Sequence, residues 1–501
     1  MSNVQPLHFK YPETSIYWLL GVILVPLIIR KVLNRYPRLS ALPPGPAGFP
    51  IFGNAFQVPV KMPWFKFTKW AEEFGPIFSL NMAGHPIIVV NMFKAAHDLV
   101  DRRSDIYSDR PRFIISGEIF KLRKLRRASH EGLNSRAIEK YQHILTREVA
   151  LATFQTLNSP DAWVSHINRA CASVILSTVY GWPPLIDKDG PLVEEIHAMG
   201  AKITEGVVPG AYLVDIIPAL EYLPPWAAKW KREGIKWHQH IMKVLEGFNA
   251  EVETKMLKGQ SPECFVSDLI TTKGRHELTD KEAAWLAGII FLAGPEALAQ
   301  TLLYFILAMI LYPNVMRKAQ AELDDVVGRG RIPTFEDQKK LPYIEAVVRE
   351  TLRWRPPAPM GVPRNATEDH WYDGYLIPKG ATVISNIWDS KIFLDFDDFR
   401  PDRFLDGIPE YTRSAGHTSF GFGKRICVGN DFANQMLYMT VVTILWASNI
   451  EKALDSGGKP IIPSKHDFVE AGIAVGPAPF PCKFSARFPD ALSILKARLA
   501  D

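Results

Sequence analysis

The chain has 501 residues, of which 47% are hydrophobic and 11% aromatic, and its formal net charge at pH 7 is +5. So small a charge does not indicate nucleic-acid binding, and the even spread of apolar residues predicts one large domain behind a short leader. Widely spaced cysteines without a C-x-x-C pair exclude a disulfide scaffold and a zinc ribbon, and fit a reducing compartment. They are Cys171, Cys264, Cys427 and Cys482.

The amino-terminal region contains an unbroken apolar stretch of 14 residues, Ile16 to Ile29, opened by Tyr17 and Trp18. A bilayer crossing takes about 20 apolar residues, but interfacial aromatic and basic side chains compensate for a short stretch. The basic residues that follow predict that the remaining chain is cytoplasmic; they are Arg30, Lys31, Arg35 and Arg38. We therefore predict a lumenal tail over 1–14 and a membrane anchor helix over 15–31. A cleaved signal peptide and a helix in one leaflet are the alternatives.

A proline-rich hinge is predicted over residues 32–55. Its centre, Leu42 to Pro50, has four prolines in eight residues and so takes an extended, semi-rigid path instead of a helix. Without further context, the same composition also fits a plain linker or an SH3-domain ligand.

A long apolar helix is predicted from Thr279 to Tyr312. Thr279 and Glu282 have the spacing of a capping box, and the pattern then stays apolar for about 33 residues, or about 50 Å. Pro295, inside Ala293-Gly-Pro-Glu296, removes one backbone donor and predicts a kink. A helix this long suits the centre of a large all-α enzyme.

A second helix is predicted from Leu341 to Arg355, ended by Pro356 and Pro357. Glu350 and Arg353 lie on one face at i,i+3 and are able to pair. Taken alone, this pair is typical of a charged surface.

A single cysteine lies in a glycine-rich loop, Phe420-Gly-Phe-Gly-Lys-Arg-Ile-Cys427-Val-Gly429. The glycines permit backbone angles and close approaches that other residues do not. Lys424 and Arg425 favour the thiolate form of Cys427, which is the form that binds metals, and Phe420 and Phe422 are expected to shield the sulfur. A buried, inert cysteine is the alternative; a dinucleotide loop fits less well, because Ile426 stands where a third glycine is needed.

The loop matches Phe-x-x-Gly-x-Arg-x-Cys-x-Gly in full and resembles the cytochrome P450 family of haem-thiolate enzymes. The resemblance extends from about Leu42 to Phe488. It implies a mainly α fold with a small β region, in which a catalytic domain over 56–501 holds haem b. Cys427 would be the axial ligand of the iron, within a loop that also includes Phe420 and Gly429.

The resemblance also implies roles for residues outside the loop. The Thr279–Tyr312 helix would cover the distal side of the haem, and three arginines would contact its propionates. Glu350 and Arg353 would join Arg403 in a buried structural triad. The propionate partners are Arg425, Arg364 and, in a basic helix, Arg126.

Several positions depart from the family pattern. Ala297 stands where most members have a threonine that helps to deliver protons, whereas the neighbouring acid, Glu296, is retained. Proton delivery would then depend on Glu296, on water, on a substrate hydroxyl or on Thr301, one turn further along. Leu122 replaces a common tryptophan, and the segments 110–121 and 389–398 look short.

The resemblance implies a monooxygenase in the endoplasmic reticulum membrane, with O2 as oxidant. Electrons would come from NADPH through a flavoprotein reductase that docks on a basic face around Lys424. The segments Gly374–Lys379 and Asn386–Trp388 resemble those of fungal microsomal members, which implies a lipophilic, terpenoid-like substrate. Ala297 leaves open a haem-thiolate isomerase or dehydratase, or a haem-binding relative with little activity.

Overall fold

The computed structural model of the protein describes residues 41–112, 126–185, 191–206, 218–388, 395–407, 417–471 and 474–500, with the single residues 212, 214 and 393. The predicted tail, membrane anchor and first part of the hinge lie outside the described residues. So do Leu122, residues 113–121 of the first segment that looks short, and residues 389–392 and 394 of the second.

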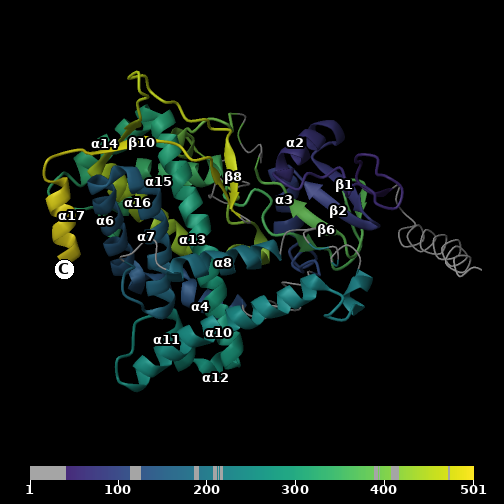
Figure 1. Cartoon of the computed structure of the whole chain (residues 1–501). Helices are drawn as coiled ribbons and strands as arrows, with labels where there is room; N and C mark the ends of the chain where they lie inside the picture. Colours follow the sequence, from purple (N-terminus) through teal and green to yellow (C-terminus); the bar gives the residue numbers. More distant parts are fainter. Residues whose placement is uncertain are drawn as a thin grey trace, which may run out of the picture.

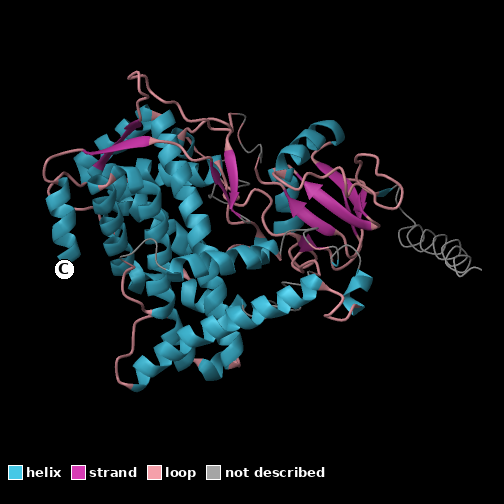
Figure 2. Cartoon of the chain, in the orientation of Figure 1, coloured by secondary structure: helices cyan, strands magenta, loops and turns pink. Residues whose placement is uncertain are grey.

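Helices dominate the structure, and a smaller region contains most of the strands (Figures 1 and 2). The α-helices of the described residues are α2 (Pro63–Phe74), α3 (Phe93–Ala96), α4 (Arg126–Leu133), α5 (Ser135–Ile138), α6 (Gln142–Asn158), α7 (Trp163–Tyr180), α8 (Pro191–Glu205), α10 (Lys229–Leu257), α11 (Phe265–Thr271), α12 (Lys273–His276), α13 (Asp280–Leu311), α14 (Pro313–Val326), α15 (Pro342–Trp354), α16 (Asn430–Ala447) and α17 (Ala491–Ala500). The prediction of a mainly α fold with a small β region is confirmed.

The main sheet has the strand order β1-β2-β6-β3 and packs beside α2 and α3 (Figure 1). Three two-stranded sheets accompany it: β10 with β7, β4 with β5, and β8 with β9. The strands are β1 (Ile77–Met82), β2 (His85–Val90), β3 (Arg364–Asn365), β4 (His370–Tyr372), β5 (Tyr375–Ile377), β6 (Thr382–Ser385), β7 (Ser448–Lys452), β8 (Phe468–Ala471), β9 (Ala474–Pro477) and β10 (Cys482–Ala486). Strand β6 runs parallel to β2, with Ile88 opposite Val383, and therefore joins chain segments almost 300 residues apart.

Helix α13 crosses the centre of the helical region (Figure 1). Its 32 residues and its capping box at Thr279 and Glu282 confirm the prediction, and the helix continues through Pro295. Within the described part of the chain, α13 is the one helix that is long and apolar enough to cross a membrane. More than half of its most apolar part is buried inside the protein, as expected of a core helix.

The described part of the predicted hinge lies along β1. The Ser79 hydroxyl donates to the Pro43 carbonyl at 2.6 Å, and the Ser79 amide donates to the Pro44 carbonyl at 2.8 Å. Farther along, the Asn81 amide donates to Oδ1 of Asn54 at 2.7 Å. These hydrogen bonds attach residues 43–54 to the sheet.

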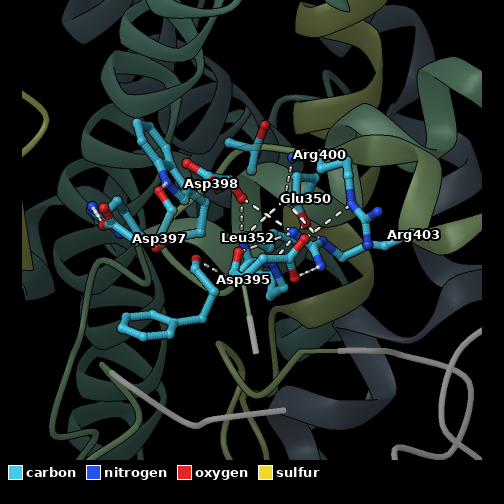
Figure 3. Close-up of polar contacts among 12 residues, drawn as sticks. Glu350, Leu352, Asp395, Asp397, Asp398, Arg400 and Arg403 are labelled. Atoms are coloured by element: carbon cyan, nitrogen blue, oxygen red, sulfur yellow. Dashed lines mark hydrogen bonds and ion pairs between the residues drawn. The ribbon is translucent and has the colours of Figure 1, made fainter. Parts of the chain in front are cut away.

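A buried charge network lies at the carboxyl end of α15 (Figure 3). The Glu350 carboxylate is fully buried and accepts hydrogen bonds from Arg353 at 2.7 and 2.9 Å and from Nε of Arg403 at 3.2 Å. Nη1 of Arg403 also donates to Oδ1 of Asp395 at 2.6 Å. Two carboxylates thus balance two guanidinium groups, and buried charges persist only when they are paired in this way.

The same network holds the backbone of residues 395–400 (Figure 3). Oε1 of Glu350 accepts the Arg400 amide at 2.7 Å, while Arg353 donates to the carbonyls of Phe396 at 2.7 Å and Asp398 at 3.0 Å. The hydrogen bond from Arg403 lowers the pKa of Asp395 below its usual value. Since the bonds end on backbone groups of a distant segment, we predict a structural role for the network.

Glu350→Ala should destabilise the protein by about 3–5 kcal/mol, because it leaves two buried guanidinium groups without their shared carboxylate. Denaturation by urea measures this change. Glu233→Gln is the matched control, since Glu233 pairs with Lys229 at 3.6 Å on an exposed face of α10. It should cost no more than about 1 kcal/mol. Equal losses in the two variants would contradict the structural role of the Glu350 network.

Candidate functional site

The cysteine loop is a series of tight turns that leads into α16. The Gly421 amide donates to the Thr418 carbonyl at 2.8 Å, and the Cys427 amide donates to the Phe420 carbonyl at 2.8 Å. Gly421 and Gly423 have φ of +77° and +52°, as expected for glycine. Gly429 has φ −91°, so the expectation that it needs glycine-specific backbone angles was wrong. A Cβ at this position would lie 4.0 Å from Sγ of Cys427, which is an ordinary van der Waals distance.

Cys427 differs from the other three cysteines in its exposure. It is exposed, whereas Cys171 and Cys264 are buried and Cys482 is partly buried. Burial raises the pKa of the Cys171 and Cys482 thiols to about 12. Cys427 instead lies just before the first turn of α16, and a helix amino terminus stabilises a thiolate. Cys427 is therefore not the buried cysteine of the alternative interpretation.

The aromatic residues of the loop face packed regions of the protein. Phe422 is 7% exposed and its ring centroid lies 6.2 Å from that of Phe93. Phe420 is partly buried against the main helical core. Just before them, the Ser419 hydroxyl donates to the Leu352 carbonyl, next to the Glu350 network (Figure 3). The two phenylalanines therefore attach the loop to both regions of the fold.

Two of the three predicted propionate partners lie at this loop. Arg364 is 6% exposed, and its guanidinium donates to the carbonyls of Val100 at 3.0 Å and Phe422 at 2.5 Å. Nε of Arg425 donates to the Ser108 carbonyl at 2.7 Å. The two arginines thus contact the chain between residues 100 and 108 as well as the loop. The side chain of Arg126, at the start of α4, lies outside the described residues.

Helix α13 has an open face in its otherwise buried middle. Ala293 is exposed and Ala297 is partly exposed. Glu296 accepts a hydrogen bond from Nε2 of Gln300 at 2.7 Å, and its charge adds to the raised pKa of buried Cys171. Gln300 packs on β9, since a Cβ at Gly476 would lie 1.6 Å from its Oε1. Gln300 was not predicted from the sequence, although its i,i+4 spacing from Glu296 is a signal that could have indicated the hydrogen bond.

Thr301 does not fit the additional proton-delivery role considered for it. Its side chain is 2% exposed and its hydroxyl donates to the Ala297 carbonyl at 2.8 Å. A threonine that bonds to the carbonyl four residues earlier uses its proton within the helix. Glu296 is therefore the acidic candidate on this part of α13.

The residues present fit a haem. The loop exposes one thiol, α13 exposes small uncharged side chains, and Arg364 supplies a buried cation beside the loop. In a haem, the iron would take the thiolate as a ligand, the ring would pack against apolar side chains and a propionate would pair with the cation. Helices α13 and α16 also lie side by side, because Leu302 and Met436 line the same small internal cavity.

Two basic side chains, Lys424 on the loop and Arg127 on α4, lie beside acidic residues. Lys424 forms an ion pair with Asp105, and both side chains are exposed. Arg127 is exposed and lies 3.8 Å from Glu131 on α4. The face that was expected to be positive therefore carries acidic residues as well.

Two acidic residues near the predicted site were missed in the sequence. Asp395 shares Arg403 with Glu350, and Asp101 accepts the Gly423 amide at 2.8 Å. The second contact joins residues 322 positions apart, so no local pattern indicates it.

Comparisons with known proteins agree with this geometry. The family model described as Cytochrome P450 matches residues 43–469. Cytochrome P450 monooxygenase 58 of Postia placenta is 47% identical over 491 residues, covering 94% of this chain and 93% of the relative. A cytochrome P450 monooxygenase of Armillaria gallica is 40% identical over 510 residues, covering 97% of each chain. One of Amanita muscaria is 34% identical over 547 residues, covering 96% and 97%.

Members of this family use a haem-thiolate iron, O2 and electrons from a redox partner, which supports oxygen chemistry over the isomerase and inactive alternatives. The chain belongs to the cytochrome P450 family and is an oxygen-using monooxygenase.

Proposed function

We propose that the protein holds haem b through the Cys427 thiolate and hydroxylates a lipophilic small molecule. The observation that carries the proposal is that Cys427 is exposed, in a glycine-turned loop at the start of α16, while the other cysteines are buried or partly buried. A thiolate-ligated haem, when bound, supplies the activation of O2.

The chain's own residues would orient the haem and supply protons. Arg364 and Arg425 would pair with its propionates, with Arg126 as a third partner. Glu296, held by Gln300, would deliver protons from one side of α13. Ala297 adds no hydroxyl, so a water or a substrate hydroxyl would complete the path. The apolar face at Ala293 and Ala297 excludes water from the rest of the site.

We propose the substrate, partner and location by analogy with fungal microsomal members of the family. The substrate would be lipophilic and terpenoid-like, and electrons would come from NADPH through a flavoprotein reductase. Residues 15–31 would anchor the protein in the endoplasmic reticulum membrane, residues 32–55 would form the hinge, and the catalytic domain over 56–501 would face the cytoplasm.

Cys427→Ser should abolish the absorption of thiolate-ligated haem and lower haem occupancy, because a serine hydroxyl remains protonated and is a poor ligand for the iron. Absorption spectroscopy and a haem assay of the purified protein measure both effects. Cys482→Ser is the matched control, because Cys482 lies on β10 and is partly buried. An unaltered spectrum in Cys427→Ser would show that another residue ligates the iron.

Ala297→Thr should lower the release of hydrogen peroxide per NADPH consumed several-fold, because a hydroxyl at this position restores an ordered proton path. Peroxide and NADPH are measured together in membranes that contain the reductase. Ala293→Thr, one turn earlier on the same face of α13, is the control and should leave the ratio nearly unchanged. An unchanged ratio in Ala297→Thr would contradict the role assigned to the missing hydroxyl.

A further inference from the structure

A buried histidine and aspartate face the cysteine loop from a turn that the proposed function does not use. His97 and Asp101 lie in a π-helical turn, His97–Asp101, that continues α3. Nδ1 of His97 donates to Oδ2 of Asp101 at 2.8 Å, and each side chain is 8% exposed. The His97 ring also stacks on Phe93, with centroids 5.8 Å apart and planes 10° apart.

The other oxygen of Asp101 binds the backbone of the loop. Oδ1 accepts the Gly423 amide at 2.8 Å, four residues before Cys427. Arg364 reinforces the contact, since it donates both to the Val100 carbonyl of the π-helical turn and to the Phe422 carbonyl of the loop. We call His97, Asp101 and Arg364, with Phe422 and Gly423, the loop clasp.

At Gly423, the π-helical turn and the cysteine loop approach each other too closely for any residue but glycine. A Cβ at Gly423 would lie 2.8 Å from the Val100 carbonyl oxygen and 2.9 Å from Cβ of Ser104. The φ of +52° at Gly423 adds backbone strain for other residues. Because the two segments are in such close contact, the position of the cysteine loop depends on the π-helical turn that packs against it.

We propose that Asp101, oriented by His97, is a positioning residue that fixes the loop at Gly423 and so determines how completely Cys427 ligates the haem iron. The proposal rests on haem ligation by Cys427. The proposed role is to hold the loop in position. Asp101 contacts the backbone of the loop, and His97 fixes the direction of the Asp101 carboxylate. A buried carboxylate that accepts two hydrogen bonds is more strongly ordered than an exposed ion pair such as Lys424 with Asp105.

Four variants distinguish an effect of the loop's position from an effect of the negative charge of Asp101. Asp101→Ala removes the acceptor of the Gly423 amide, whereas Asp101→Asn keeps an oxygen for that amide and a polar group for His97. His97→Phe keeps an aromatic ring next to Phe93 but loses the donor. Asp105→Asn is the matched control, because it removes a carboxylate that contacts the next residue of the same loop from an exposed position.

Two measurements apply to each full-length variant. Hydrogen–deuterium exchange of a peptide containing Gly423 reports the opening of the loop. The spectrum of the reduced, carbon monoxide-bound protein, at equal haem content, reports the fraction with thiolate ligation. Asp101→Ala should speed exchange by about tenfold or more, as expected for loss of a buried hydrogen bond to a charged acceptor, and should lower the thiolate fraction.

The remaining variants should fall between the unaltered protein and Asp101→Ala. Asp101→Asn should be close to the unaltered protein in both measurements, His97→Phe should be intermediate, and Asp105→Asn should be unchanged. If Asp101→Ala does not fold, His97→Phe carries the test, and its failure to change either measurement overturns the proposal.

Faster exchange without a loss of thiolate ligation, or the reverse, also overturns the proposal. A loss in Asp105→Asn as large as that in Asp101→Ala would do the same. Absence of a thiolate signal in the unaltered protein would instead refute haem ligation by Cys427, while the exchange rates would still show whether Asp101 holds the loop.

Discussion

The function that we propose depends on holding one exposed cysteine, Cys427, in a fixed place. A loop of turns has few internal hydrogen bonds, so its position must come from contacts with its neighbours. Ser419 bonds to the end of α15, where Glu350 and two arginines fix the adjoining chain. On the other side, Arg364 and Asp101 bind the backbone of Phe422 and Gly423. The loop is therefore held from the helical region and from the sheet region.

The polar groups around the site differ in how deeply they are buried. Glu350, Arg353 and Arg403 are buried and fully engaged, as their structural role requires. Glu296 is partly exposed and accepts a hydrogen bond from Gln300. Thr301 is buried and bonded within the helix. Our proposal therefore assigns proton delivery on α13 to Glu296, next to the position where Ala297 lacks a hydroxyl.

The sequence predicted the features that depend on neighbouring residues. The capping box and length of α13 were predicted correctly, and α15 ends where the prolines stop it. Partners that are distant in sequence were missed: Asp395 in the charge network, Gln300 against Gly476, and Asp101 under Gly423. Each contact is made by packing between elements, which leaves no periodic signal. Gly429 shows the same limit, because its φ of −91° is set by the fold and is one that other residues also adopt.

The central claim is that the sulfur of Cys427 ligates the iron as a thiolate. The most direct test is the absorption spectrum of the unmodified, full-length protein after reduction and addition of carbon monoxide. Strong electron donation by a thiolate shifts the main haem band to longer wavelength than a neutral ligand does. We predict the long-wavelength band in nearly all haem-containing molecules. A band typical of a neutral axial ligand in freshly prepared protein, or a protein that retains no haem, would contradict this account.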